Sequence, residues 1–116
     1  MTVSAIVLAL AALGGLTMVV IRLSGAPRPP TWLALGHGAI AMIGVALLAY
    51  AVVSPGIPPM AQIALGLIVL AALGGSAIFL IFHLKNVPLP IPLVLGHGLL
   101  ALTGLTFLLV SLYRIA

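Results

Sequence analysis

The sequence predicts an all-α membrane protein in which four transmembrane helices form a bundle made of two parallel-repeat helical hairpins. Three observations support this fold class. The 116 residues are 65% hydrophobic and 3% charged, with four basic residues and no acidic one. Segments rich in proline and glycine divide the chain into four long apolar runs. Two short motifs each occur twice, sixty residues apart.

This composition excludes several classes of protein. So few charged side chains do not cover a water-soluble domain, and long apolar runs predict spans that contact the lipid bilayer. The four basic residues form no patch, so nucleic acid is not an expected partner despite the net charge of +4. The absence of cysteine excludes disulfides, thiolate metal sites, iron–sulfur clusters and covalent haem attachment. No nucleophile–base set or nucleotide loop is present, so we expect no enzyme, although an electron-transfer subunit of an oxidoreductase complex is compatible with the sequence.

The four apolar runs predict four helices in chain order: Val3–Leu23, Thr31–Val53, Met60–Leu84 and Ile91–Tyr113. Each run has about twenty residues or more, enough for a helix to cross the hydrocarbon core. The segments SGAPRPP (24–30), SPGIPP (54–59) and NVPLPIP (86–92) between them cannot continue helices and predict turns.

The basic residues predict the orientation in a bacterial inner (cytoplasmic) membrane. Arg22, Arg28 and Lys85 lie at the first and third turns, the second turn has no charge, and Arg114 lies near the C-terminal end. The positive-inside rule therefore places the first and third turns in the cytoplasm and both termini outside.

An offset of sixty residues aligns the two halves of the chain. LAALGG occurs at 10–15 and 70–75, and LGHG occurs at 35–38 and 95–98. With one residue of slip, Arg22 aligns with His83. We therefore expect one integral membrane domain, 1–116, made of repeats 1–56 and 61–116 in the same orientation, related by a pseudo-twofold axis along the membrane normal. The LAALGG segments have the small-xxx-small spacing of helix packing, and we interpret them as structural.

The two LGHG motifs each begin a helix face of small residues. Ala41 and Gly44 lie four and seven positions after His37, and Ala101 and Gly104 follow His97 in the same way. Residues at this spacing share one face, which leaves a strip of about 10 Å without bulky side chains beside each histidine. A flat macrocycle needs such a strip, and haem iron takes axial imidazoles.

These positions predict one haem b between the second and fourth helices. His37 and His97 are the expected metal ligands, and the four small residues would lie along the ring. Basic groups at the cytoplasmic side would pair with the haem propionates, because cations bind carboxylates well and the chain has no carboxylate side chain of its own. The expected propionate partners are Arg22, Arg28, His83 and Lys85.

The combination resembles four-helix membrane b-type cytochromes that serve as haem-binding anchor subunits of respiratory enzymes. The resemblance rests on His37 and His97 on different helices, with small residues along the ring face. It implies ligand roles for these two histidines and an electron-transfer or anchor function in a larger complex. Other membrane subunits or a second copy of the chain, and quinone, are then the candidate partners. The chain departs from the family in having repeat-related ligands and no quinone-site carboxylate, and it is also similar to small uncharacterised four-helix bacterial membrane proteins.

Other interpretations of the same residues remain open. A histidine beside small residues also holds the magnesium of a (bacterio)chlorophyll, which would make the chain a subunit of a photosynthetic complex. In a cofactor-free accessory subunit, His37 and His97 would hydrogen-bond across a closely packed helix interface. For His83 and the basic residues, the alternative is an interfacial role near lipid headgroups. A small multidrug-type exporter is disfavoured, because such exporters depend on a membrane-embedded Glu that this chain lacks.

Overall fold

The computed structural model describes residues 1–116 and contains four long helices. These are α1 (Thr2–Leu23), α2 (Thr31–Val52), α3 (Pro59–Ile78), which continues into a π-helical turn η1 (Phe79–His83), and α4 (Ile91–Ile115). The four helices predicted from the apolar runs are confirmed, with ends that differ by at most two residues when α3 and η1 are taken together. All four are long and apolar enough to cross a membrane.

Proline and glycine residues in the turns determine where the helices begin and end. Pro30, Pro58 and Pro90 each precede the first residue of a helix, where their missing N–H leaves no intrahelical bond unmade. Gly25 and Gly56 adopt positive φ angles of 112° and 82° in the first and second turns, a conformation that glycine adopts without steric cost.

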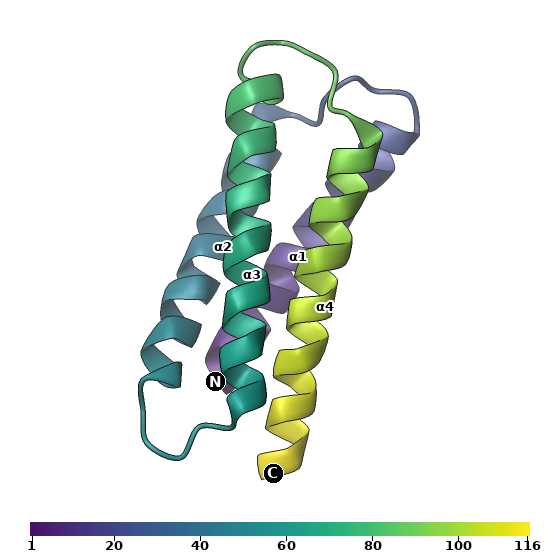
Figure 1. Ribbon diagram of the computed structural model, residues 1–116. Coiled ribbons are helices and arrows are strands. Elements are labelled where there is room, and N and C mark those ends of the chain that lie inside the picture. The colour runs from purple at the N-terminus through teal and green to yellow at the C-terminus, as the bar shows by residue number, and fades with distance from the viewer.

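The helices form an elongated bundle with extents of 45 × 20 × 18 Å. Each helix packs on two neighbours in the cyclic order α1, α2, α3, α4, which makes α2 and α4 diagonally opposite. The first and third turns (residues 24–30 and 84–90) lie at one end, which we call the paired-turn end. Both chain termini and the second turn lie at the opposite, terminal end (Figure 1).

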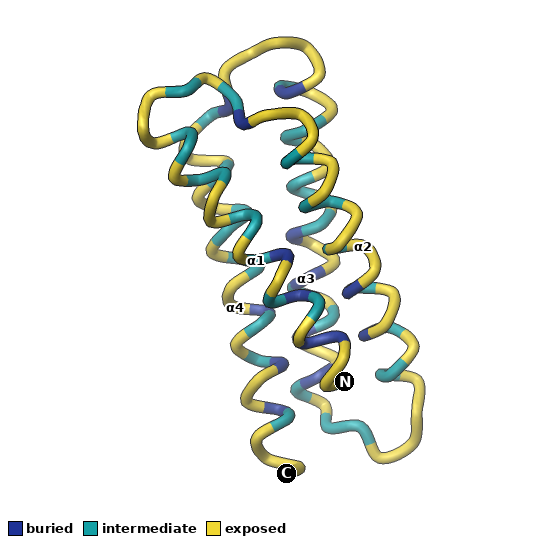
Figure 2. Tube along the Cα trace, turned by 180° about the vertical axis from the view of Figure 1, so that it is seen from behind, coloured by how far each residue is buried: buried dark blue, intermediate teal, exposed yellow.

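The close-packed core occupies the half of the bundle toward the terminal end. Its members are Ala5, Leu8, Leu48, Ala64, Ile68 and Leu108. Figure 2 shows most buried positions in this half and a smaller group near the paired-turn end. Gly44 and Gly104 belong to the tight half, because a Cβ atom on them would come within 2.7 Å of Leu8 and 2.6 Å of Ile68. These two glycines let a bulky side chain from the neighbouring helix pack against the backbone.

The end of the third helix explains an irregularity in the sixty-residue offset. In η1 the Leu84 N–H donates to the Phe79 carbonyl at 2.9 Å, an i to i+5 bond. Such a turn accommodates one more residue than an α-helical turn. The offset slips by one residue between Gly75 and His83, so the π-helical turn lies in the segment where the sequence has its additional residue.

Candidate cofactor site

His37 and His97 make the same contact in the two halves of the chain. The Nδ1 atom of His37, on α2, lies 2.8 Å from the Ala11 carbonyl oxygen on α1. The Nδ1 atom of His97, on α4, lies 2.7 Å from the Ala71 carbonyl oxygen on α3. Both carbonyls belong to the LAALGG segments. The two duplicated motifs of the sequence are therefore the two sides of one helix–helix contact, formed twice.

The last glycine of each LAALGG segment makes room for the imidazole. A Cβ atom at Gly15 would lie 3.0 Å from Cε1 of His37, and one at Gly75 would lie 2.7 Å from Cε1 of His97. Both values are below ordinary van der Waals contact. A side chain at Gly75 would force the His97 ring to shift, and one at Gly15 would require the His37 ring to move by a few tenths of an ångström. The preceding glycines face less crowded space, since a Cβ at Gly14 would have no atom nearer than 3.8 Å and one at Gly74 would have none within 4 Å.

The carbonyl partners determine the tautomer of both histidines. A carbonyl oxygen only accepts hydrogen bonds, so Nδ1 must carry the proton and donate it. In the neutral imidazole Nε2 then has a free lone pair. An imidazole held in this way, with one nitrogen bonded to a backbone carbonyl and the other bare, is the form in which histidine ligates metals.

The two imidazoles meet inside the bundle although they come from diagonal helices. Their ring centroids are 6.2 Å apart, and the ring planes are nearly perpendicular at 88°. Both side chains are half-buried. No group of three or more His, Cys, Asp or Glu side chains that could hold a metal ion is present, so a metal at this point would have the two imidazoles as its only side-chain ligands from these residue types.

A cavity of about 720 Å³ surrounds the histidine pair, and we call it the histidine cavity. All three histidines of the chain and Arg22 line it, and most of the other lining residues are apolar. Such a volume, with few polar groups among many apolar ones, is typical of cofactor and ligand sites, which span about 300–1,000 Å³. Side chains fill the terminal half of the bundle, whereas the half that contains the histidines encloses the cavity.

His83 is held at the paired-turn end of the cavity. Its side chain is buried, Nε2 lies 3.0 Å from the Thr31 hydroxyl, and its ring stacks on Phe79 with centroids 5.1 Å apart. The His83 backbone carbonyl accepts a 3.0 Å hydrogen bond from Nη1 of Arg28. His83 is thus a structural connection between the two halves of the chain as well as part of the cavity wall.

The three basic side chains near the paired-turn end differ in their position relative to the cavity. Arg22 lines the cavity and donates from Nε to the Leu89 carbonyl at 2.8 Å. Arg28 lies outside the cavity lining and bonds the His83 carbonyl. Lys85 is exposed in the third turn and does not line the cavity. Of the four groups expected near propionates, only Arg22 and His83 reach the cavity that contains the histidine pair.

Of the small residues expected along the ring, some line the cavity and others lie outside it. Ala41 and Ala101 line the cavity, as do Gly38 and Gly98. Gly44 and Gly104 are buried and lie outside it, because Leu8 and Ile68 occupy the space above them. The strip of small residues is therefore shorter than the spacing of the sequence indicated. The sequence does not reveal that the strip is shortened, because the side chains that close it, Leu8 and Ile68, come from the neighbouring helices.

Sequence reasoning missed Gly15 and Gly75 as part of the site. Their small-xxx-small spacing predicts general helix packing, whereas in the structure each lies against one particular imidazole. The signal was present in the sequence: LAALGG and LGHG are the two motifs that recur intact at the sixty-residue offset. Segments that recur together at one offset are expected to contact one another, which pairs LAALGG with LGHG.

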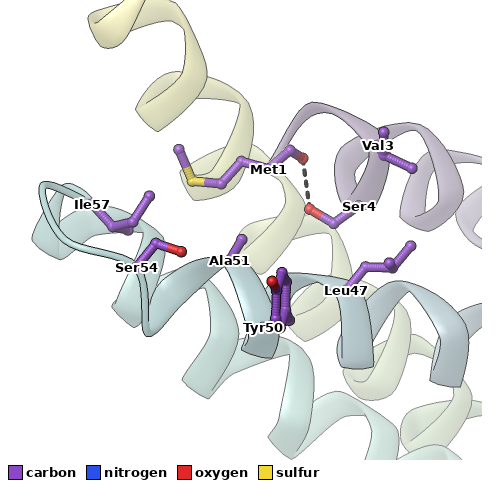
Figure 3. A pocket seen from close by; sticks show the side chains of 8 residues that line it. All are labelled: Met1, Val3, Ser4, Leu47, Tyr50, Ala51, Ser54 and Ile57. Atoms are coloured by element: carbon purple, nitrogen blue, oxygen red, sulfur yellow. Dashed lines mark hydrogen bonds between the residues drawn. The ribbon is translucent and has the colours of Figure 1, made fainter.

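A second, smaller cavity of about 360 Å³ lies at the terminal end (Figure 3). It is lined by Met1, Val3, Ser4, Leu47, Tyr50, Ala51, Ser54 and Ile57, none of which has a charged side chain. The Ser4 hydroxyl donates to the Met1 carbonyl at 2.6 Å, so its hydrogen-bonding capacity is used locally. The buried Ser111 hydroxyl has no partner, but it lines neither cavity. The histidine cavity is therefore the candidate site.

Comparison of this chain with protein-family models, with curated proteins and with solved structures finds no match.

Proposed function

We propose that the chain is an integral membrane b-type haem protein in which His37 and His97 are the two axial ligands. One observation supports this proposal above the others. Two imidazoles from diagonal helices present bare Nε2 atoms in one largely apolar cavity, with their Nδ1 atoms held by backbone carbonyls at 2.8 and 2.7 Å. When bound, haem would supply a one-electron couple, and the function would be electron transfer or anchoring within a larger complex.

The separation of the two rings fits a shared metal. Imidazole nitrogen bonds a metal at about 2 Å, and with ring bonds near 1.35 Å the nitrogen lies about 1.15 Å from the ring centroid. Two imidazoles on opposite sides of one metal therefore have centroids roughly 6.3 Å apart. The separation of 6.2 Å agrees with this value. The angle of 88° between the ring planes is also acceptable, because each ring can turn about its own metal–nitrogen bond.

The residues that hold the histidines and the ligand then have distinct roles. The carbonyls of Ala11 and Ala71 accept hydrogen bonds from Nδ1 of the imidazoles, which fixes their tautomer and orients the rings. Gly15 and Gly75 leave space for the rings. Arg22, in the wall of the cavity, is the cation best placed to bind an anionic group of the ligand, since charge-assisted hydrogen bonds to carboxylates are strong.

The environment follows from the apolar surface and the distribution of basic residues. Four helices long and apolar enough to span a membrane, with Arg22, Arg28 and Lys85 at the paired-turn end, support insertion of two hairpin repeats with this end in the cytoplasm of a bacterium. The proposed haem would lie in the cytoplasmic half of the bilayer. Other membrane subunits, a second copy of the chain or quinone would exchange electrons with it.

The geometry argues against the chlorophyll alternative in its two-pigment form. Two stacked macrocycles, each with its own histidine, need an additional ring-to-ring spacing of about 3.5 Å between their metals. The separation of 6.2 Å between the imidazoles leaves room for one ring plane only. A cofactor-free accessory subunit would use the same histidines for helix packing, and the experiment below distinguishes it.

Absorption spectroscopy tests the proposal. The detergent-purified protein, supplemented with haemin, should show a sharp α-band on reduction with dithionite, typical of six-coordinate low-spin haem. His37→Ala and His97→Ala should each abolish that band, while the control Gly74→Ala, whose Cβ would meet no atom within 4 Å and which does not line the cavity, should retain it. A wild-type spectrum with protein absorbance only would refute haem binding and leave helix packing as the role of the histidines. A spectrum unchanged in both ligand variants would refute the ligand assignment.

A further inference from the structure

The paired-turn end of the histidine cavity is closed by the backbone of the two turns. Pro29 and Leu89, sixty residues apart, are both buried and both line the cavity. The Leu89 N–H donates to the Pro27 carbonyl at 3.0 Å, and its carbonyl accepts from Nε of Arg22 at 2.8 Å. Leu89 is therefore fixed from both sides over the end of the cavity.

A second set of bonds strengthens this closure. His83 contacts the start of α2 through Thr31 and the first turn through Arg28, and only 3% of its surface is exposed. Both sets of bonds connect the first half of the chain to the second. A ligand that approached the cavity along the bundle axis from the paired-turn end would have to break them.

The sides of the cavity are less closed, and they differ from each other. Ser76 on α3 and Leu16 on α1 occupy equivalent positions sixty residues apart, and both line the cavity and are exposed on the outside of the bundle. The Ser76 hydroxyl donates to the Ala72 carbonyl at 2.8 Å, so it adds no unpaired polar group. Serine is much smaller than leucine, so less side-chain bulk lies on the side that includes Ser76.

The outward extent of the cavity differs in the same direction. Three positions line the cavity in one sense: Leu35 and Ala39 on α2 and Leu80 on α3 do, and their equivalents Leu95, Leu99 and Val20 do not. One position shows the reverse, since Leu13 on α1 lines the cavity and its equivalent Leu73 does not. Exposed leucines line the cavity on both sides, with Leu35 and Leu80 at 56% and 57% exposed and Leu13 and Leu16 at 63% and 59%. The cavity therefore reaches the outer surface on both sides, and the α2–α3 side has more lining positions and the smaller residue, Ser76. We call Leu35, Ala39, Ser76 and Leu80 the lateral portal.

We propose that the histidine cavity is loaded sideways from the bilayer through the lateral portal between α2 and α3, by a flat apolar ring dissolved in the membrane. The identity of the ring as haem rests on the proposed function, whereas the route does not. An apolar macrocycle partitions into acyl chains, and in a membrane those chains would contact the exposed leucines of the portal. A ring loaded in this way exposes one edge to the lipid, so its electron-exchange partner approaches within the membrane at the α2–α3 side.

The rate of haemin uptake tests the route. Apo-protein in phosphatidylcholine vesicles is mixed with donor vesicles that contain haemin, and the appearance of the low-spin spectrum is followed. Ser76→Leu gives the portal the residue of the other side and should slow uptake about tenfold, the effect of roughly 1.4 kcal/mol in an activation barrier. The matched control Leu16→Ser should load at the wild-type rate or faster. Equal rates for Ser76→Leu and wild type, or an equal slowing by both substitutions, would overturn the proposal.

A labelling experiment tests the portal without haem. The natural chain has no cysteine, so Ala101→Cys introduces a single thiol in the cavity wall. A lipid-soluble pyrene maleimide should label it in vesicles, and adding Ser76→Leu should reduce the labelling rate several-fold. A charged, water-soluble maleimide should react poorly. Preferential labelling by the charged reagent, or no effect of Ser76→Leu, would overturn lateral access. If wild-type protein binds no haemin, the proposed function fails while this labelling pattern still decides the portal.

Discussion

Adding one methyl group at Gly75 should weaken haemin binding strongly, although Gly75 is not itself a ligand. The new Cβ would lie 2.7 Å from Cε1, 3.2 Å from Nδ1 and 3.3 Å from Nε2 of His97. The closest of these falls 0.7 Å short of the 3.4 Å at which ordinary contact begins. The imidazole must move by about this amount, because the new methyl group is attached directly to the helix backbone.

The displacement acts on metal binding through the hydrogen bond of His97. Its Nδ1 lies 2.7 Å from the Ala71 carbonyl, and a shift of about 0.7 Å moves it beyond good hydrogen-bond distance. The bond itself is worth about 0.5–1.5 kcal/mol. Loss of such a supporting contact to a metal-ligating histidine costs about 10–100-fold in metal affinity. We therefore expect Gly75→Ala to weaken haemin binding by about 10–100-fold.

The neighbouring glycine provides the control. A Cβ at Gly74 would meet no atom within 4 Å, so Gly74→Ala makes the same chemical change in the same helix without touching His97. Both variants would be purified in one detergent and titrated with haemin, with the Soret band as the readout. The reasoning is refuted if Gly75→Ala and Gly74→Ala bind haemin with the same affinity, or if Gly74→Ala is the weaker of the two.

Three further predictions concern the tautomer, the tight half and the paired-turn end. In ¹⁵N NMR spectra of the apo-protein, His37 and His97 should both show a protonated Nδ1 and a bare Nε2; a majority of the other neutral tautomer would contradict the carbonyl contacts. Gly104→Ala should destabilise the bundle by about 1–3 kcal/mol through overpacking against Ile68, and thermal unfolding in detergent should show no comparable loss for Gly66→Ala, whose Cβ would meet nothing within 4 Å. Thr31→Val should cost about 1 kcal/mol by removing the hydrogen bond to His83 and should speed hydrogen exchange at residues 84–89; unchanged exchange there would show that the bond does not hold the turn.

The sequence alone determined the helices and the candidate ligands of this protein. Apolar runs and proline-rich turns determine where a helix of sufficient length to span a membrane begins and ends, because backbone hydrogen bonding and side-chain hydropathy are local properties. The repeated LGHG motifs singled out His37 and His97, which the fold brings to a centroid separation of 6.2 Å. Their equivalent positions in the two halves are a property of the sequence, and so is the absence of any carboxylate side chain.

The tertiary structure decided what surrounds those ligands. The Ala11 and Ala71 carbonyls fix the imidazole tautomers, and Leu8 and Ile68 close the space above Gly44 and Gly104. These are contacts between residues far apart in the chain, and side-chain spacing along one helix carries no information about which neighbour fills its groove. The same physical reason applies to the closed paired-turn end and to the unequal sides of the histidine cavity. Both depend on how four helices with similar apolar surfaces pack, a choice set by the shapes of all their side chains together.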